Sequence, residues 1–415
     1  MKKFFKYLML YIIFLCLSIN TYAQTPLKIG LSLSLSGKYE KMGKMQNNAY
    51  LLWEEEINKK GGLIDKTVEM IIYDDKSELE EAVKLYSKLI YEDKVDILIG
   101  PYSSEITIAV LPITKSAGYP LIIPGGTADE IWDKKDDNIE EKKNGAKNTL
   151  AFGLLPPASR YTVGFLELLL RADLSKIVIL HSNDPFSTAC ASGAREWAQR
   201  FGLTVSLYAG FSKNTVGEYN TFAQNIKTLD EKEKISDTKE NKPFIRGIEG
   251  VIICGYYEDG LKMREAFRDA RWYPKAYYAS VGPAFQDYYD DLGINAEGVF
   301  SSSHWEANSE NHNERCENFI YEFLKEYQTE PTYNAAAAYA ACQVIEIVIT
   351  SNKSLDKEKF SDQLFKINEA TVIGKLDFDK TGMQIRKYPY IIQWQQGRKE
   401  IVWPENLKTK DPFIE

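Results

Sequence analysis

Short apolar runs that alternate with helical stretches are the feature of this sequence that most limits the folds open to it. In the first part of the chain, the strand-like runs are 28–35, 68–73, 95–99 and 120–123. The stretches with helical periodicity between them are 47–58, 79–91 and 103–117. Strands joined through helices of this length run parallel, and the helices cover both faces of the sheet. This part of the chain therefore predicts a doubly wound α/β unit.

The same alternation begins again near residue 150. Its strand-like runs are 150–154, 176–181, 203–208, 250–254 and 275–279. Its helical stretches are 161–171, 186–201, 222–229 and 260–270. The last part of the chain adds two longer helices and two short strands, at 313–327, 333–350, 374–378 and 388–394. The sequence predicts two doubly wound units in tandem, which fits the two or three domains expected for 415 residues.

The N-terminus has the pattern of an export signal. Lysines among the first six residues precede an uninterrupted apolar run of 11 residues, 7–17. Thr21 and Ala23 then place small residues just before a cleavage site that precedes Gln24. We expect residues 1–23 to be a cleaved secretory signal peptide and the mature protein to be periplasmic or extracytoplasmic. A retained N-terminal anchor is the alternative, although the run is short for a membrane span.

The cysteines leave two questions open. Cys16 allows a lipoprotein interpretation, but that processing needs a small residue before the cysteine and Leu15 is large, so plain cleavage is favoured. We interpret the cysteines of the mature chain mainly as small buried hydrophobic residues. An exported chain could oxidise one pair, and the sequence does not select it. These cysteines are Cys190, Cys254, Cys316 and Cys342.

The polar residues argue against nucleic-acid binding, catalysis and metal binding. With 51 basic and 59 acidic residues, the formal net charge is −8, so the chain has no overall attraction for phosphate backbones. No histidine and cysteine cluster has zinc-site spacing, and no nucleophile elbow is present. His181, Ser182 and Asp184 have the composition of a triad, but neighbouring residues at a strand end point apart. We predict no enzyme activity, no cofactor and no metal.

Two highly charged segments interrupt the alternation. Residues 133–147 and 230–246 each hold five acidic and five basic residues and lack an apolar period. Such charge-balanced runs are typical of solvated surface loops. We therefore expect loops in both places, and a role in docking a partner protein is the alternative.

Two loops have the chemistry of an anion site. Residues 100–105 and 124–129 each follow a predicted strand with a glycine turn, a hydroxyl residue and a helix start. In doubly wound sheets, ligands bind beyond the carboxyl ends of the strands, and free backbone N–H groups at a helix start attract anions. Ser103 and Thr127 could serve only as helix caps. Two such loops at neighbouring strand ends nevertheless favour a shared carboxylate pocket.

The chain resembles the periplasmic solute-binding proteins of ABC transporters, of the leucine/isoleucine/valine-binding type. The resemblance covers nearly the whole mature chain and rests on the order and spacing of stretches 28–37, 56–62, 73–75, 99–104 and 124–127. It implies a periplasmic binding protein type I fold, in which two doubly wound parallel-sheet lobes are joined by three hinge crossovers and close over a ligand. Lobe 1 would hold 24–153 and 304–372, and lobe 2 would hold 154–303 and 373–415.

The resemblance also implies which residues hold the ligand. The carboxylate contacts would come from Ser103, Gly125 and Thr127, and Gly126 would be a further ligand-binding residue. The walls of the side-chain pocket would come from Met42, Tyr102, Phe186 and Tyr256. These residues would supply apolar surface and hydroxyl groups around a small ligand.

The charge that would pair an ammonium group is missing from its usual place. The family places a glutamate on the second lobe for this purpose, and that position falls on Val281. A buried ammonium without a partner costs several kcal/mol. Glu258 or Asp259 could replace the glutamate. Otherwise the ligand lacks an α-amino group, as an amide, urea or a simple carboxylic acid does.

The resemblance implies a binding protein that captures a small polar solute, either an amino acid or a related amide or carboxylate. The protein would deliver that solute to an ABC permease in the inner membrane, and it would act as a monomer without nucleic acid. Two alternatives stay open. The first is a ligand-sensing receptor component of the same fold. The second and less favoured one is an exported α/β hydrolase, which would need a nucleophile and base pair.

Overall fold

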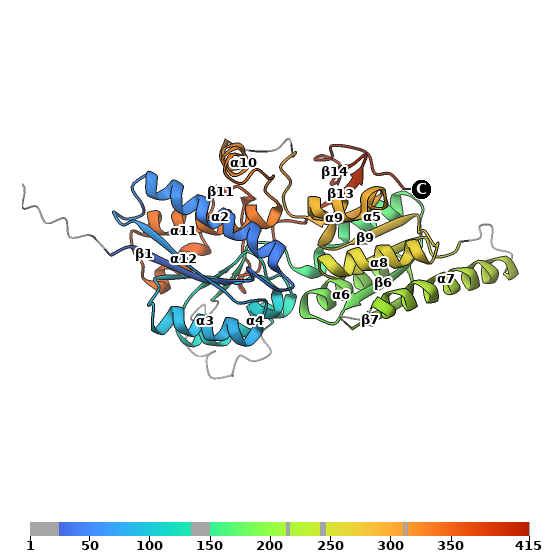
Figure 1. The fold of residues 1–415 in the computed structure, drawn as a ribbon, viewed down its shortest axis with the longest axis horizontal. Helices are drawn as coiled ribbons and strands as arrows, with labels where there is room; N and C mark the ends of the chain where they lie inside the picture. The colour runs from blue at the N-terminus through green and yellow to red at the C-terminus, as the bar shows by residue number, and fades with distance from the viewer. Residues whose placement is uncertain are drawn as a thin grey trace, which may run out of the picture.

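The computed structural model describes residues 25–133, 150–212, 216–240, 246–309, 312 and 314–414. Within these residues the chain forms two lobes that lie side by side (Figure 1), each built on its own sheet. The predicted signal peptide and all but the first residue of the charged segment 133–147 lie outside the described residues.

The first lobe is built on a five-stranded parallel sheet with strand order β2-β1-β3-β4-β5. Its strands are β1 (Leu27–Leu33), β2 (Val68–Asp74), β3 (Ile97–Ile99), β4 (Leu121–Ile123) and β5 (Ala151–Gly153). The helices between them are α2 (Glu40–Lys59), α3 (Leu79–Tyr91) and α4 (Ser104–Ser116), followed by η1 (Asp129–Trp132). Figure 1 shows α2 on one side of this sheet and α3 and α4 on the other. The predicted doubly wound arrangement is therefore confirmed.

The second lobe is built on a seven-stranded sheet with strand order β14-β13-β10-β9-β8-β6-β7. Its parallel strands are β6 (Lys176–Ser182), β7 (Thr204–Phe211), β8 (Gly250–Cys254), β9 (Ala276–Ala279) and β10 (Val299–Ser303). An antiparallel pair, β13 (Tyr390–Gln395) and β14 (Arg398–Trp403), completes one edge. The helices are η3 (Ala158–Arg160), α5 (Val163–Arg171), α6 (Pro185–Arg200), α7 (Val216–Lys239), α8 (Tyr257–Asp269), η4 (Gly282–Ala284), α9 (Gln286–Leu292) and η5 (Gly293–Ala296).

Late segments of the chain return to the first lobe. These segments are α10 (Glu314–Tyr327), α11 (Tyr333–Asn352), α12 (Lys357–Leu364) and the small ribbon of β11 (Ala370–Thr371) and β12 (Gly374–Lys375). Helix α11 packs along α2, and the Tyr339 hydroxyl donates to Glu56 Oε2 at 2.5 Å. The chain thus crosses between the lobes after β5, after β10 and before β13. The lobe boundaries proposed from the resemblance stay a prediction.

One strand belongs to a different sheet than the alternation alone suggested. The run 150–154 looked like the start of the second unit, but β5 pairs with β4 and forms the edge of the first sheet. The pairing joins Ile122 with Phe152, and both side chains are fully buried. An apolar run of this length fits either sheet equally well, so its sequence could not decide between them.

Helix α11 is the one described helix that is long and apolar enough to cross a membrane. It is mostly buried, and its alanine-rich first half, which includes Ala335–Ala338, is completely covered. Small side chains let a neighbouring helix approach closely, and α2 occupies this face. Helix α11 is therefore explained as a core helix of the first lobe.

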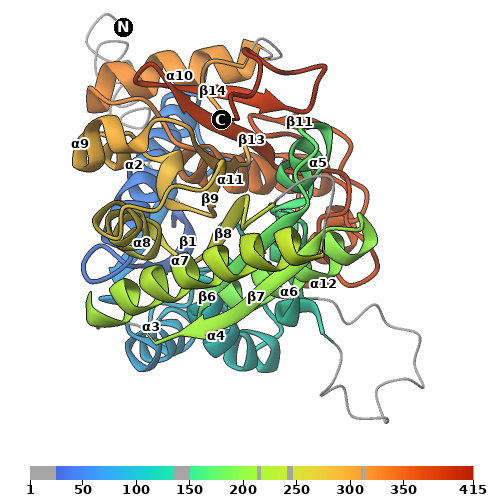
Figure 2. The ribbon, with the colours of Figure 1, turned by 90° about the vertical axis from the view of Figure 1, so that its right-hand side faces the viewer.

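The prediction of a loop at 230–246 is wrong for most of this segment. Helix α7 continues through Lys239 and crosses the second lobe (Figure 2), while residues 241–245 lie outside the described residues. Asp237 is buried, and its Oδ2 accepts hydrogen bonds from Lys176 Nζ at 2.8 Å and from the Arg246 backbone at 2.9 Å. Asp230 accepts from the indole of Trp272 at 3.0 Å. Asp230 and Asp237 therefore pair with other segments instead of facing water, whereas Glu231 and Glu240 are exposed.

Removing the lysine of this network should destabilise the second lobe. We expect Lys176→Met to lower the free energy of unfolding by about 3 kcal/mol, because it leaves a buried carboxylate without its cation. Urea unfolding followed by tryptophan fluorescence measures the change. The control is Lys232→Met on the exposed face of α7, which should change stability by less than about 0.5 kcal/mol. Equal effects of the two variants would show that the network is only a surface ion pair.

Candidate functional site

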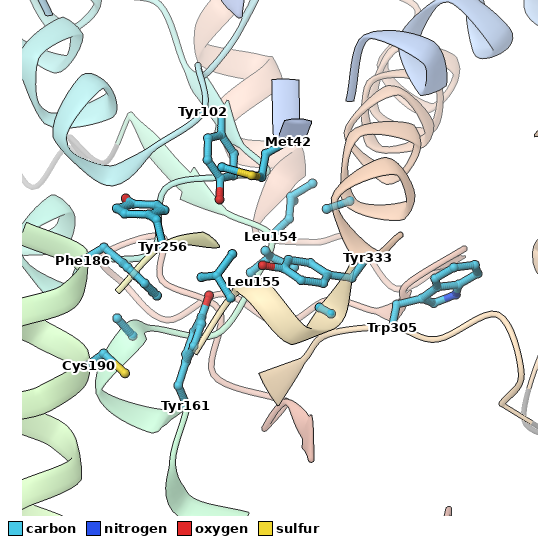
Figure 3. Packing of buried hydrophobic residues seen from close by; sticks show 14 of the residues in the cluster. Met42, Tyr102, Leu154, Leu155, Tyr161, Phe186, Cys190, Tyr256, Trp305 and Tyr333 are labelled. Carbon is cyan, nitrogen blue, oxygen red and sulfur yellow. The ribbon is translucent and has the colours of Figure 1, made fainter. Parts of the chain in front are cut away.

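A small cavity lies where the two lobes meet, at the ends of strands and the starts of helices. Its aromatic walls are Tyr102, Tyr161, Phe186, Tyr256 and Tyr333. The remaining lining residues are Gly125, Thr127, Leu155, Val281 and Asn334. The cavity measures about 10 Å³, which is room for about one water molecule. Figure 3 shows Tyr102, Tyr256 and Phe186 around this space, with Tyr161, Leu155 and Tyr333 beside them.

Contacts between the lobes close this space. The rings of Tyr39, from the first lobe, and Tyr256, from the second, lie 4.7 Å apart between centroids. The hydroxyl groups of Thr127 and Tyr161 lie 3.1 Å apart. A ligand larger than water can enter only if these contacts separate, so access depends on movement of the lobes.

The loop after β4 forms one wall of the cavity and is held by a serine hydroxyl. The backbone N–H groups of Thr127 and Ala128 donate to Ser104 Oγ at 3.0 and 2.9 Å. Ser104 therefore ties this loop to the start of α4, whereas Ser103, which was predicted as a ligand contact or a helix cap, is the N-cap residue without a side-chain cap hydrogen bond. Position 125 has no room for a side chain, because a Cβ atom on Gly125 would lie 2.8 Å from the Tyr102 ring.

The structure brings most of the predicted ligand-binding residues together. Those that line the cavity are Tyr102, Gly125, Thr127, Phe186 and Tyr256. Met42 is fully buried and points toward Tyr102 (Figure 3), and Ser103 is also fully buried. Gly126 packs on Thr107 of α4. These three residues support the lining but are not part of it.

The two acidic residues that were candidates for an ammonium partner do not reach the cavity. Glu258 is exposed on α8 and is not among the lining residues. Asp259 is buried and caps its own helix, because its Oδ2 accepts the Tyr256 N–H at 2.9 Å. Its Oδ1 accepts the Tyr219 hydroxyl at 2.9 Å. Neither residue therefore replaces the glutamate that the family has at the position of Val281.

Four lining residues were not predicted. Leu155 comes from the first crossover between the lobes, Tyr161 lies between η3 and α5 of the second lobe, and Tyr333 and Asn334 begin α11. A signal for the second pair exists in the sequence, since Thr332 precedes a long apolar helix and is a good helix-start residue. That signal gives the helix start but not its position at the cavity, which depends on the return of α11 to the first lobe.

Uncharged groups surround the cavity. Burial is the largest of the effects that raise the pKa of Tyr102, Tyr161 and Tyr256 well above the usual value. Their hydroxyl groups therefore stay protonated at neutral pH and can donate hydrogen bonds. The lining includes no carboxylate and no cationic side chain.

Helix starts give the cavity its electrostatic character. Helix α4 begins just after Tyr102, Phe186 lies in the first turn of α6, Tyr256 is the N-cap of α8, and Tyr333 begins α11. The start of a helix carries free N–H groups and a partial positive charge, which attract anions. Asp184 and Asp259 already cap α6 and α8, whereas α4 and α11 have no side-chain cap, so the starts of these two helices are suited to a negatively charged group.

Among the described residues, no set of side chains is arranged as a metal site or as a catalytic triad. No group of three or more histidine, cysteine or acidic side chains among them could hold a metal ion. His181 contacts the backbone oxygen of Ser182 at 3.1 Å, whereas Asp184 caps α6 through Ser187. The described cysteines are free and buried.

A larger cavity of about 640 Å³ lies elsewhere, at the edge of the second lobe. Its walls come from α8, β9, η5 and the C-terminal segment, and they include Arg264, Trp394 and Phe413. All of these elements belong to the second lobe, so movement of the lobes would not change its shape. The small cavity is the better candidate because both lobes contribute to its walls.

Comparison with known proteins gives a consistent match along the chain. A family model described as a periplasmic binding protein matches residues 26–399. The leucine-, isoleucine-, valine-, threonine- and alanine-binding protein of Pseudomonas aeruginosa is 23% identical over 379 residues, which cover 90% of this chain and 91% of that protein.

Solved structures agree with the fold. The substrate-binding protein of a branched-chain amino acid transporter from Streptococcus pneumoniae, in complex with isoleucine, aligns with a TM-score of 0.73 at 19% identity. That alignment covers 90% of this chain and 98% of the other. A solute-binding protein of an ABC transporter from R. palustris, in complex with benzoate, aligns with a TM-score of 0.75 at 18% identity, covering 94% and 99%.

Proposed function

The chain belongs to the periplasmic binding protein family, and on this premise we propose that it captures a small solute between its two lobes and delivers it to an ABC permease in the inner membrane. It is a binding protein and not an enzyme. The solute is an amino acid or a related amide or carboxylate. We propose that the protein acts as a monomer.

The position of the cavity carries this proposal. Residues from both lobes line it, so a solute bound there would hold the lobes together. Contacts such as that between Thr127 and Tyr161 would break when the lobes open and form again around the solute. Hinge closure of this kind turns binding into a change of shape that a permease can recognise.

Export is part of the proposal. Relatives of this family work outside the cytoplasm, and a permease can receive solute only from a protein on that side of the membrane. We propose that residues 1–23 are removed by cleavage before Gln24. Mass spectrometry of the protein recovered from the periplasm should give an N-terminal peptide that begins at Gln24, and recovery of the intact N-terminus would contradict cleavage.

Thermal unfolding of the purified mature protein tests the proposed function. The panel contains amino acids, amides, urea and small carboxylates. A solute at 100 times its dissociation constant should add about 2.7 kcal/mol to the free energy of unfolding, which raises the melting temperature measurably. No shift with any member of the panel would contradict capture of an amino acid, amide or small carboxylate.

Removing the hydroxyl group of Thr127 should weaken binding of the best solute in the panel. We expect Thr127→Ala to cost about 1–3 kcal/mol of binding, because a buried hydrogen bond to the solute is lost. Isothermal titration calorimetry measures the dissociation constant. Thr228→Ala, on the exposed surface of α7, removes a hydroxyl far from the cavity and should leave affinity unchanged. An unchanged dissociation constant in Thr127→Ala would show that Thr127 is only structural.

A further inference from the structure

The polar groups around the cavity include no partner for the ammonium group of an α-amino acid. An amino acid carries both a carboxylate and an ammonium group, and each must find a partner when it is buried. The lining offers hydroxyl groups from Thr127 and tyrosines, and one amide, from Asn334. It offers no carboxylate to an ammonium group.

Two acidic residues close to these walls already serve other groups. Asp184 accepts the Ser187 N–H at 3.0 Å and the Ser187 hydroxyl at 2.7 Å, and so caps α6. Glu105 accepts the hydroxyl of Tyr39 and pairs with Lys38. Neither carboxylate is part of the lining. An ammonium group in the cavity would therefore be buried without an opposite charge, at a cost of several kcal/mol.

A carboxylate, in contrast, meets several favourable groups. Four helices begin at the cavity, and carboxylates of the chain itself cap α6 and α8. Helices α4 and α11 have no side-chain cap, so the N–H groups of their first turns can meet a carboxylate. Asn334 supplies an independent observation, because it is only 1% exposed, lines the cavity and has no hydrogen-bond partner for its Oδ1. As placed, this oxygen calls for a donor, and a half-turn of the amide puts the N–H₂ group in its position, where it can donate to an anion.

A second buried amide lies behind the glycine wall. Gln46 is completely buried, and neither its Oε1 nor its Nε2 has a hydrogen-bond partner. A Cβ atom on Gly125 would lie 3.2 Å from that Nε2, so the amide is adjacent to the loop that lines the cavity. Buried polar atoms without partners cost free energy, and a ligand that supplies the partner recovers it.

The remaining walls are apolar and mostly aromatic. The walls beside the polar groups include Leu155, Val281, Phe186 and the rings of Tyr102 and Tyr256. Aromatic walls of this kind favour flat or apolar ligand bodies.

From these observations we infer that the ligand is a monocarboxylate with an apolar or aromatic body and without an ammonium group, held through its carboxylate by the helix starts and by Asn334. This inference rests on the proposed function and narrows its ligand class.

Calorimetry with matched pairs of compounds tests the inference on the mature protein. The pairs are 3-phenylpropanoate with phenylalanine and 4-methylpentanoate with leucine, which differ only by the amino group. At least one acid should bind ten times or more tighter than its amino acid. Tighter binding of an amino acid would overturn the inference and leave the proposed function intact. Binding of neither member of either pair would also overturn it, and the panel of solutes then decides the proposed function separately.

Substitution of the cavity amide gives a second test. Asn334→Asp keeps the size of the side chain and suits the first turn of α11, where a negative charge is favourable. Asn334→Asp should weaken binding of the acid at least tenfold. It should also reduce the ratio of the affinity for the acid to the affinity for the matching amino acid. Asn225→Asp adds the same charge on the exposed surface of α7, and it should change neither the affinity for the acid nor the affinity ratio of acid to amino acid. An unchanged acid affinity in Asn334→Asp, with an unchanged melting temperature, would show that Asn334 does not face the carboxylate.

Discussion

Replacing Gly125 with alanine is expected to weaken solute binding by about a hundredfold. The added methyl group would lie 2.8 Å from the Tyr102 ring and 3.2 Å from Gln46 Nε2, so the ring must move into the cavity. Overpacking of this kind costs about 1–3 kcal/mol, and the upper end corresponds to a hundredfold change in the dissociation constant. Isothermal titration calorimetry with the best solute of the panel measures it.

A matched glycine supplies the control for this prediction. Gly217, in the first turn of α7, has open space around its Cβ position and an ordinary backbone conformation. Gly217→Ala should keep the affinity of the wild type and leave stability equal or higher, because alanine is the better helix former. If Gly125→Ala binds as tightly as Gly217→Ala, the loop after β4 is not a wall of the binding site.

The second large effect concerns acid stability and depends on His304. This residue follows β10, where the chain crosses back to the first lobe, and it is buried between the rings of Tyr161 and Tyr333 at 4.7 and 5.0 Å. Neither ring nitrogen of His304 has a hydrogen-bond partner. Burial, with a smaller contribution from the positive charge of Lys387, lowers the pKa of His304 from 6.5 to about 3.

The sign of the effect follows from proton binding. Below pH 6.5 the unfolded chain takes up a proton at His304, whereas the folded protein resists it until about pH 3. The contribution of His304 to the free energy of unfolding is therefore fully present above pH 6.5 and is lost as the pH falls toward 3. At 1.36 kcal/mol for each pKa unit, the loss between pH 7 and pH 4 is about 3 kcal/mol.

Urea unfolding at pH 7 and pH 4 checks this expectation. His304→Phe keeps a ring between the two tyrosines and removes the proton site, so its stability should fall by about 3 kcal/mol less than that of the wild type over this interval. The two proteins should differ little at pH 7, where the histidine is neutral in both the folded and the unfolded chain. Equal acid sensitivity in the two proteins would contradict the proposed burial of a neutral imidazole.

Much of the fold could be predicted because apolar runs mark the buried strands. Strands β2, β6 and β8 lie within a residue of their predicted ends, and the loops that follow β3 and β4 supply Tyr102, Gly125 and Thr127 to the cavity. These loops were recognisable because a glycine turn and a helix start follow a strand in each case. Local chemistry of this kind does not depend on the rest of the molecule.

The parts that could not be predicted depend on contacts between distant segments. Strand β10 ends in Ser301, Ser302 and Ser303, which look polar in sequence, yet all three are buried. Their burial is possible because the partners come from elsewhere, as when the Ser302 hydroxyl donates to the backbone of Tyr161 at 2.7 Å. Asp230 and Asp237 of α7 were misread for the same reason, since their partners lie on other segments.

A distance measurement between the lobes tests the central claim, which is capture of a solute between them. Lys41 of α2 and Asp287 of α9 form an exposed ion pair across the lobes, and such pairs contribute at most about 1 kcal/mol. Spin labels on a Lys41→Cys, Asp287→Cys variant would report this separation. The cysteines of the described chain are buried, so they should not react with the label.

Pulsed electron spin resonance should give a longer, broader distribution of distances without solute and a short, narrow one with the solute that raises the melting temperature most. Addition of Gly125→Ala to the labelled variant should prevent the change at the same solute concentration. An identical distribution with and without saturating solute would contradict capture by closure of the lobes.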